Sequence, residues 1–586
     1  MSDGIIRSLQ RKSFSRRGFL VAGLGVAGAA LLQACGGQEP LETATSASSA
    51  STSSSSAATS AATTTTSTGG AGTPTAESTT AAVATSAPTK PADVEHKKGG
   101  TINVAIIGEP PVTADAMFTT NFITTDITRQ IYEGLFAQDS KLGPKPMLLD
   151  AFEVSEDGLT YTFKLRSGVK FHNGDTMDAD DVVASLTRWG KMTGRGKQIF
   201  ALMAPDGLKA ADPQTVTLAL TQPAGVLPVF LALYEGFITT KEVCDAIGTN
   251  KMPDDQIVGT GPFKFKEHQV DRYIKLDRFE DYSARNDEAD GLAGKKVVYI
   301  DELNIIPVPN ISVATSGVIT GEYHFARDVD NNQLDVLKTS PGVTAIIKKP
   351  GGWICLNYNK KMGAFTDKKL RQAVSMCFDR EQTLIAAYGV KELTRMDPSI
   401  AAPETIWYSQ AGKDVYEKVD QEEAKKLVQE SSYDGSPIRW LTTKEYLYHY
   451  NTAAYVQQQM EAIGLKVELL VSDWATVVER RAKPEVYEML VAGLSGSWMP
   501  ATQLFNDSSW PGFWESEQRD ELVGKMIEES DPNKLQQTID AYQALIYDEL
   551  PIMKIGDNFS LQAIRDEVVG FDTGANDWYF WNCSLK

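Results

Sequence analysis

Side chains that could catalyse a reaction or hold a metal are present in this sequence, but their spacing matches no site of either kind. The 586 residues include five cysteines and five histidines, and none forms a CxxC pair or a Cys/His spacing typical of zinc. No Gly-x-Ser-x-Gly nucleophile motif or phosphate-binding loop occurs. The carboxylate pairs Asp180-Asp181 and Asp254-Asp255 are adjacent in sequence, which is typical of helix caps and solvated turns. We therefore expect no enzyme and no metal or other cofactor.

One cysteine has a sequence context with a chemistry of its own. Cys35 ends a Leu-Gln-Ala-Cys motif that resembles a bacterial lipobox, in which the cysteine is lipidated and becomes the first residue after cleavage. Arg16 and Arg17 precede the uncharged, Gly- and Ala-rich run 18–34, as in a twin-arginine export signal. A membrane span needs about 20 apolar residues, and this run is slightly short. We expect a lipoprotein signal over residues 1–35 and not a transmembrane anchor.

A low-complexity segment follows the lipobox. From Glu39 to Pro91 the chain is nearly all Ser, Thr and Ala, and it lacks the large apolar side chains that offset chain entropy. We expect residues 36–97 to form a disordered tether. The globular body would then begin near Lys97 and lie outside the cytoplasm, in the periplasm or at the cell surface, anchored to the cell membrane by lipid.

The composition limits the kinds of molecule that the protein is expected to bind. The net charge of −19 argues against nucleic acid or an anionic membrane surface. At roughly 100–200 residues per domain, the length indicates about three domains. Folding before twin-arginine export would keep thiols reduced, so we expect buried thiols, and not disulfides, at Cys244, Cys355, Cys377 and Cys583.

The body opens with clear local signals. Residues 101–106 form a short apolar strand, and apolar residues at i, i+4 spacing over 123–135 predict a helix. Apolar alternation on both sides of Asp157-Gly158 predicts a β-hairpin. Asp178 is placed to cap the helix that follows.

Later segments also carry helix and strand signals. Thr366 is expected to cap a helix whose inner face includes Cys377. Residues 453–493 alternate between helix and strand periodicity, with Asp473 as a cap, and this alternation predicts a mostly parallel sheet with covering helices. Trp578, Phe580 and Trp581 are expected to form a final packing element.

Several motifs together resemble one family: the peptide/nickel class (family 5) of extracytoplasmic solute-binding proteins of ABC importers, which includes dipeptide- and oligopeptide-binding lipoproteins. The resemblance covers the chain from about Gly99 to the C-terminus, in the family's order. The matching segments are Gly99-Gly100-Thr101, Ile131–Leu135, Val154–Arg166, Ser167–Asp175, Ala179–Val183, Gly259–Phe263, Leu370–Val374 and Asp379–Glu381. Within them, His172 is expected to be a hydrogen bonder in a turn, and Gly259 and Gly261 to allow unusual backbone angles.

The resemblance implies an α/β, two-lobed periplasmic-binding-protein-like fold with an extra inserted domain, whose hinged lobes close on a ligand. The implied domains are lobe I (98–145, 259–358 and 555–586), inserted domain II (146–258) and lobe III (359–554). A solute receptor needs a cleft between such lobes.

Two stretches flank the ligand in the family. Here the implied ligand-binding residues are Glu109, Pro111 and Val112 after the first strand, and Gly493, Ser495, Ser497 and Trp498 in lobe III. Backbone at the second stretch pairs with an extended peptide in peptide-binding members. Trp353, which follows Gly351-Gly352 at the domain crossing, is a further candidate.

Peptide receptors of the family usually show Gly-Trp-x-x-Asp at the second stretch, where the aspartate is thought to hold the ligand's amino terminus. Here Ser497 stands at the aspartate position, so one charge-assisted hydrogen bond to an ammonium group is missing. We expect no strong requirement for a free α-amine, although Glu109 could supply a carboxylate instead.

The resemblance implies a receptor that captures an oligopeptide or related polar solute and delivers it to an ABC permease and ATPase complex. We expect a monomer. Two alternatives stay open: a membrane-tethered solute sensor on the same fold, and a receptor for a non-peptide ligand such as an oligosaccharide or a metal chelate.

Overall fold

The computed structural model describes residues 96–107, 113–119, 122–572 and 578–586. The predicted signal with Cys35, nearly all of the predicted tether, and the candidate ligand residues Glu109, Pro111 and Val112 lie outside these residues. Within the described residues, no helix is both long enough and apolar enough to span a bilayer.

An eleven-stranded mixed sheet runs through the described body, with the strand order β15-β14-β16-β12-β17-β11-β1-β10-β9-β8 and β13 attached to β17. Its strands are β1 Thr101–Ile107, β8 Phe263–Gln269, β9 Tyr273–Arg278, β10 Glu302–Val308, β11 Phe325–Ala326, β12 Val343–Tyr358, β13 Thr394–Arg395, β14 Ile438–Thr442, β15 Val467–Val471, β16 Met489–Ser495 and β17 Ile552–Arg565. The α/β fold class expected from the sequence is confirmed.

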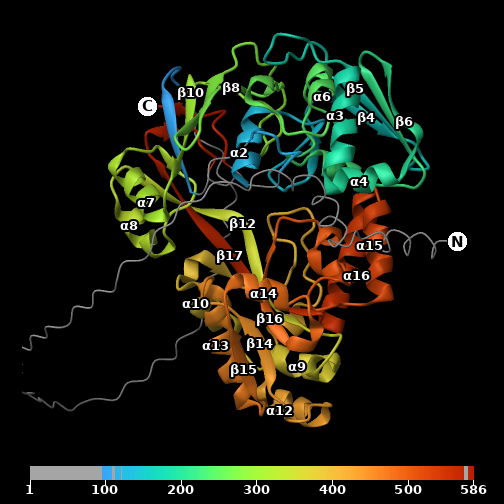
Figure 1. The fold of residues 1–586 in the computed structure, drawn as a ribbon, viewed down its shortest axis with the longest axis vertical. Coiled ribbons are helices and arrows are strands. Elements are labelled where there is room, and N and C mark those ends of the chain that lie inside the picture. The colour runs from blue at the N-terminus through green and yellow to red at the C-terminus, as the bar shows by residue number, and fades with distance from the viewer. Residues whose placement is uncertain (1–95, 108–112, 120–121, 573–577) are drawn as a thin grey trace, which may run out of the picture. The chain divides into compact units, whose positions relative to one another are not determined.

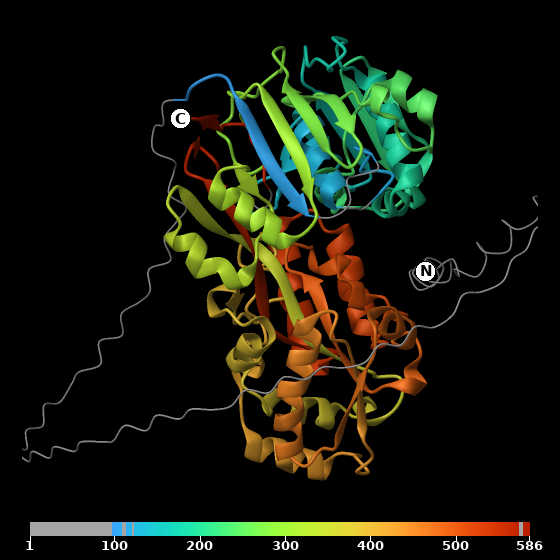
Figure 2. The same cartoon turned by 60° about the vertical axis from the view of Figure 1, so that its left-hand side comes forward.

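Strands β12 and β17 are the long connectors of this sheet (Figure 1). They pair antiparallel from Val343 opposite Arg565 to Asn357 opposite Ile552, with an irregularity between Lys348 and Gly352. At one end β17 also pairs with β11, and at the other β12 pairs with β16. The two strands therefore carry the sheet from the part that contains β1 to the part that contains β14, as the turned view also shows (Figure 2).

The prediction of a mostly parallel sheet for the later part is only partly right. β14 pairs parallel with β15 and with β16, as helix–strand alternation requires. The central pairs β16–β12 and β12–β17 are antiparallel. Residues far apart in sequence form these pairs, so the local alternation over 453–493 gave no information on their direction.

A separate four-stranded sheet has the order β4-β5-β7-β6 and lies within the range predicted for domain II. The predicted hairpin forms its first two strands: the Asp157 Oδ1 accepts a hydrogen bond from the Leu159 N–H at 3.0 Å, and Gly158 takes the left-handed conformation with φ of 71°. The strands of this sheet, with the small β2–β3 and β18–β19 pairs, are β4 Leu149–Val154, β5 Thr160–Leu165, β6 Met203–Asp212, β7 Thr215–Leu220, β2 Phe136–Gln138, β3 Pro144–Pro146, β18 Val568–Val569 and β19 Ser584–Leu585.

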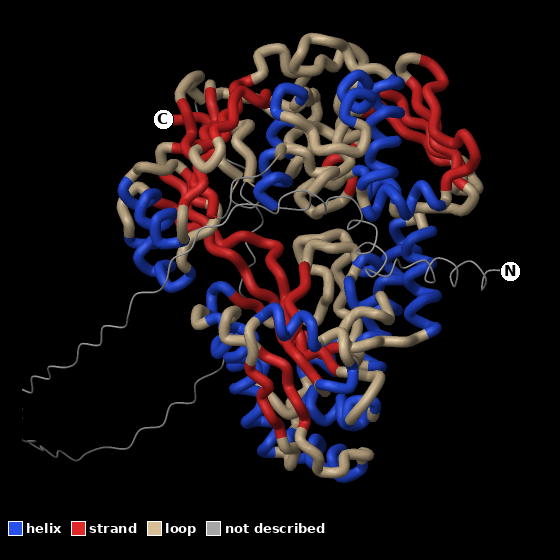
Figure 3. Tube along the Cα trace, viewed as in Figure 1, coloured by secondary structure: helices blue, strands red, loops and turns tan. Residues whose placement is uncertain are grey.

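Helices cover both sheets (Figure 3). Asp178 and Asp473 cap α3 and α14 as predicted, because their carboxylates accept hydrogen bonds from first-turn backbone N–H groups. The helices are α2 Phe122–Ile131, α3 Ala179–Met192, α4 Gly194–Ala201, α5 Leu227–Leu231, α6 Lys241–Ile247, α7 Ile311–Thr320, α8 Leu334–Thr339, α9 Lys368–Met376, α10 Arg380–Tyr388, α11 Lys413–Glu417, α12 Gln421–Glu430, α13 Leu447–Ala462, α14 Trp474–Arg480, α15 Glu517–Glu528 and α16 Pro532–Glu549.

Two sequence predictions about local chemistry need correction. The cap of α9 is Asp367 and not Thr366, since the Asp367 carboxylate accepts the hydrogen bond from the Lys369 N–H. Gly259 and Gly261 have no left-handed backbone angles. A Cβ at either position would lie 2.2 or 2.5 Å from the Ile131 carbonyl oxygen, so close packing requires both glycines.

Other predictions about the core are confirmed. His172 joins its turn to the segment at Gly259: its Nδ1 accepts from the Gly259 N–H at 3.2 Å and its Nε2 lies 3.0 Å from the Gly261 carbonyl oxygen. All four cysteines among the described residues are free and buried. The C-terminal aromatic residues, Trp578, Phe580 and Trp581, are buried as well.

Candidate functional site

A cavity of about 380 Å³ lies where β12, the end of β16 and helices α2, α4 and α5 approach one another. One wall comes from α2, α4 and the α5 region, and the other from β12, β17 and two loops. The lining residues are Arg129, Gln138, Leu142, Arg195, Val229, Phe230, Leu233, Tyr234, Lys348, Pro350, Gly351, Trp407, Ser495, Ser497, Trp498, Met499, Thr502 and Ser560. The volume is that of a typical small-solute site.

Three of the sequence-predicted ligand residues line this cavity: Ser495, Ser497 and Trp498. The Ser495 and Ser497 hydroxyl oxygens are 2.8 Å apart. The Ser495 carbonyl accepts hydrogen bonds from the Trp353 indole at 3.3 Å and from the Gln503 amide at 3.2 Å. These bonds fix the backbone where β16 ends, so both hydroxyls are held at the cavity wall.

Trp353 lies behind this wall and does not line the cavity. Its side chain is completely buried, it packs edge-on against Phe505 at 6.3 Å, and the Lys554 ammonium lies 5.7 Å from its ring centre. The reason is its position on β12, where neighbouring strands β16 and β17 flank it on both sides. Trp353 supports Ser495, and its predicted ligand contact stays a prediction.

Gly351 shapes the cavity through the absence of a side chain. A Cβ there would lie 1.9 Å from the Asn558 carbonyl oxygen on β17. The Gly351 carbonyl accepts from the Gly496 N–H at 3.2 Å, and the Gly496 carbonyl accepts from the Ala402 N–H at 2.8 Å. This backbone chain links β12, the loop after β16 and the loop that carries Trp407.

Gly493 lies on β16, outside the cavity lining, and is exposed. The ladder between β14 and β16 includes only Met489 and Leu490 of β16. Within the described residues, the β14-side edge of β16 is therefore without a strand partner at Gly493. A Cβ at Gly493 would lie 3.1 Å from the Tyr448 hydroxyl oxygen, so this hydroxyl lies over one face of β16 at Gly493.

The opposite wall combines arginines with aromatic rings. The Arg129 guanidinium lies 5.5 Å from the Tyr234 ring centre, and the Arg195 guanidinium lies 5.9 Å from that of Phe230. The Arg195 guanidinium also donates to the buried Glu235 carboxylate at 3.2 Å, so an ion pair and an aromatic ring together fix its position. Burial raises the pKa of Tyr234, so its phenol stays neutral.

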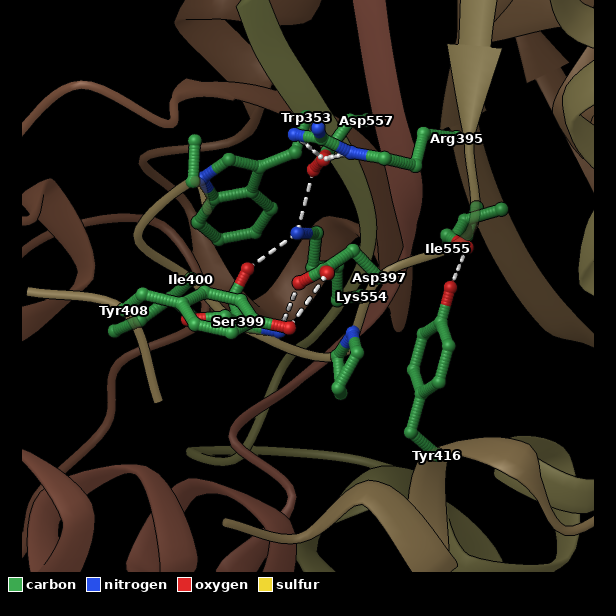
Figure 4. Close-up of polar contacts among 12 residues, drawn as sticks. Trp353, Arg395, Asp397, Ser399, Ile400, Tyr408, Tyr416, Lys554, Ile555 and Asp557 are labelled. Carbon is green, nitrogen blue, oxygen red and sulfur yellow. Dashed lines mark hydrogen bonds and ion pairs between the residues drawn. The ribbon is translucent and has the colours of Figure 1, made fainter. Parts of the chain in front are cut away.

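A buried ionic network holds the Trp407 loop on β17 (Figure 4). The Lys554 ammonium lies 2.6 Å from Asp557 Oδ1 and donates to the Ser399 carbonyl. Arg395 bridges Asp557 at 2.7 Å and Glu404 at 2.6 Å. Loop 394–409 is thereby tied to the strand that borders the cavity.

Sequence reasoning missed Arg129, Arg195, Trp407 and the network around Lys554. No local motif marks them, because they lie on separate elements that only the tertiary fold brings together. Only Lys348 and Pro350 could have been suspected from the sequence, because they lie close to Gly351-Gly352 at the expected domain crossing. Glu109, Pro111 and Val112 lie outside the described residues, so their predicted ligand contacts stay predictions.

Comparison with known proteins gives consistent matches. Residues 143–512 match the family described as bacterial extracellular solute-binding proteins, family 5 middle. The chain is 29% identical over 489 residues to a probable peptide ABC transporter periplasmic-binding protein of Sinorhizobium fredii, a match that covers 78% of this chain and 88% of that protein. It is 25% identical over 500 residues to the glutathione-binding protein GsiB of Escherichia coli K12, covering 80% and 92% of the two chains.

Solved structures agree on the fold. The substrate-binding protein CtaP of Listeria monocytogenes superposes with a TM-score of 0.72 at 23% identity, covering 83% of this chain and all of that one. The oligopeptide-binding protein AppA of Bacillus subtilis, solved with a nonapeptide, gives 0.64 at 21% identity, covering 84% of this chain and all of that one.

Proposed function

Because the chain belongs to family 5 of the bacterial extracellular solute-binding proteins, we propose that it captures an oligopeptide or related polar solute outside the cytoplasmic membrane and delivers it to an ABC permease and ATPase complex. The observation that carries the proposal is the cavity itself. It combines apolar and aromatic side chains with a few fixed polar groups, which is how a solute is held and oriented.

Residues from all three proposed domains line the cavity. Arg129 and Lys348 belong to lobe I, Arg195 to domain II, and Trp407 and Trp498 to lobe III. A solute that touches all three favours the closed arrangement, because only differential contact between open and closed states shifts their populations. Binding would thus produce the closed form that a permease can recognise.

Two observations support a peptide as the solute. The relative from Sinorhizobium fredii is named as a peptide binder and GsiB as a glutathione binder. In this chain, the β14-side edge of β16 lacks a strand partner at Gly493 within the described residues, so an extended peptide can add to it by backbone hydrogen bonds. Ser497 offers a neutral hydroxyl at the cavity wall, so we infer no strong requirement for a free α-amine.

Attachment to the membrane follows from the N-terminal signal. We infer twin-arginine export, cleavage before Cys35 and lipidation of that cysteine, so that the monomeric receptor stays at the cell membrane on its tether. Mass spectrometry of the mature protein tests this: a diacylglyceryl group on Cys35 as first residue is expected, and an intact Met1 or an unlipidated chain contradicts it.

The binding proposal is tested by equilibrium dialysis of the purified full chain against a defined tripeptide mixture, each peptide in free and N-acetylated form. We expect retention of chemically unchanged peptides, with acetylation altering affinity by less than about tenfold. Cleaved products would instead indicate an enzyme. A loss of affinity of about a hundredfold on acetylation, the scale of one ionic hydrogen bond, would show that the amine is required. Glu109 would then be the first residue to replace.

A further inference from the structure

A turn of the proposed domain II touches the end of a helix in the proposed lobe III. The turn comprises residues 223–226, and the helix is α15. The Gly225 N–H donates to the Glu528 carbonyl at 3.3 Å, and the Val226 N–H donates to the Ile527 carbonyl at 3.2 Å. Helix α15 lies away from the long connecting strands β12 and β17 (Figure 1), so this contact is a second connection, separate from those strands.

The two sides of this contact have complementary hydrogen-bonding groups. The last carbonyls of an α-helix have no partner inside the helix and need one outside it. In α15 the Glu529 N–H takes the Lys525 carbonyl, and the turn supplies N–H groups to the carbonyls of Ile527 and Glu528. Each such bond contributes only modestly, because water can replace either partner. The contact can therefore form and separate without unfolding either domain.

The turn is held in its shape by domain II alone. The Tyr161 hydroxyl donates to the Ala224 carbonyl at 2.8 Å, and the Leu227 N–H donates to the same carbonyl at 2.9 Å. Ala224 and Val226 are buried. Because the turn is already ordered, little conformational entropy is lost when it meets α15.

Gly225 is the residue that allows the close approach. A Cβ at this position would lie 2.1 Å from the Glu529 carbonyl oxygen, and its three nearest atoms would all belong to Glu529 and Ser530. The backbone of Gly225 is not in the left-handed region, so the turn itself does not require a glycine. A side chain at position 225 therefore penalises only the arrangement in which domain II touches lobe III.

The contact lies directly behind both walls of the cavity. On one side, α5 begins at Leu227, immediately after the turn, and its residues Val229 and Phe230 line the cavity. On the other side, α15 packs against the 3-10 helix Pro500–Thr502, whose Thr502 also lines the cavity. Separation of the turn from α15 would move these two parts of the lining apart.

We propose that Gly225 is a positioning residue of the receptor, which lets the turn 223–226 dock on the end of α15 as a latch that holds domain II and lobe III together around the solute. The proposal rests on the solute-binding function. All bonds of the latch join protein groups, so it favours the closed arrangement with or without solute. The apparent affinity scales with the closed fraction, so the latch strengthens binding without contacting the solute.

The first experiment needs no solute and measures hydrogen exchange of single amides in the full chain. In Gly225→Ala we expect the protection factor of the Val226 amide to fall by about tenfold or more. The Thr221 amide, which donates to the Leu202 carbonyl at 2.7 Å within domain II, should keep its protection. Gly194→Ala is the matched control, because a Cβ there meets nothing within 4 Å. Unchanged protection at Val226, or an equal fall at Thr221, overturns the latch.

The second experiment is titration calorimetry with the tripeptide best retained in dialysis. We expect Gly225→Ala to raise Kd about tenfold with little change in the melting temperature of the solute-free chain, and Gly194→Ala to change neither. Gly207→Ala is the opposite control, because its Cβ would lie 2.5 Å from the Ala219 carbonyl oxygen inside domain II and should lower the melting temperature. Wild-type affinity in Gly225→Ala overturns the proposal, as does a fall in its melting temperature as large as that of Gly207→Ala.

The two experiments separate this inference from the proposed function. If the wild-type chain retains no tripeptide, the peptide part of that function fails, and the exchange measurement still decides the latch. If tripeptides bind equally to the wild type and Gly225→Ala, the latch is refuted and the solute-binding function stands.

Discussion

Replacing Lys554 by methionine should destabilise the protein much more than the same replacement at the surface. The Lys554 and Asp557 side chains retain only 1% and 3% of their exposure, with 2.6 Å between ammonium and carboxylate. Removing one partner of such a buried pair costs about 3–5 kcal/mol, since the other charge stays buried. Arg395 still lies 2.7 Å from Asp557, so we expect the lower end, about 3 kcal/mol.

The destabilisation should also depend on pH. Burial raises the pKa of Asp397, and the neighbouring Lys554 ammonium opposes this rise. Without Lys554 the pKa of Asp397 rises further, and the folded variant takes up a proton more readily than the unfolded chain. A group with a raised folded pKa favours the folded state at low pH. The cost of Lys554→Met should therefore be smaller at pH 5 than at pH 8.

Urea unfolding followed by tryptophan fluorescence measures the difference. Lys525→Met is the matched control, because Lys525 also pairs with an acid, Glu521 at 2.7 Å, but the two side chains are 57% and 63% exposed. We expect this control to change the free energy of unfolding by less than about 0.5 kcal/mol. If Lys554→Met costs no more than Lys525→Met, the network does not stabilise the loop as argued.

Three further predictions concern stability. Burial lowers the pKa of His172 to about 4, whereas the pKa of the same side chain in the unfolded chain is about 6.5. The unfolded chain is therefore protonated first, and the free energy of unfolding should fall as the pH drops from about 6.5 to 4. His172→Asn should make this fall less steep when urea midpoints are measured against pH, and an unchanged pH dependence would contradict the role given to His172. Gly351→Ala should lower both the melting temperature and the solute affinity, because the new Cβ would lie 1.9 Å from the Asn558 carbonyl oxygen. Gly524→Ala is the control, because a Cβ there meets nothing within 4 Å and should change neither property. Equal melting temperatures for the two variants would refute this prediction. A chain beginning at Lys97 should melt cooperatively and bind as the full chain does, and loss of folding would show that the tether is part of the fold.

Local patterns predicted local structure well. The hairpin around Asp157-Gly158 could be predicted because a two-residue turn signal and period-2 alternation both lie within a few residues. The caps Asp178 and Asp473 are equally local. The error at Thr366 came from an ambiguity of one residue, since Thr366 and Asp367 are both good cap residues and only the backbone geometry distinguishes them.

Properties that depend on distant segments could not be predicted in the same way. Gly259 and Gly261 are glycines because of the Ile131 carbonyl, which lies far away in sequence. The burial of Trp353 depends on the pairing of β12 with both β16 and β17, which its neighbours in sequence do not reveal. The arginines of the cavity wall lie on helices whose sequences carry no motif that marks a binding site. Only the tertiary fold brings these helices opposite β12.

The central claim is that this cavity holds the solute, and titration calorimetry on Trp498→Ala tests it most directly. The titrant is the tripeptide best retained in dialysis, and the control is Trp510→Ala, another half-buried tryptophan that does not line the cavity. We expect one site per chain, a loss of affinity of at least about tenfold for Trp498→Ala, and little change for Trp510→Ala. Wild-type affinity in a correctly folded Trp498→Ala variant would contradict the account and place the solute elsewhere.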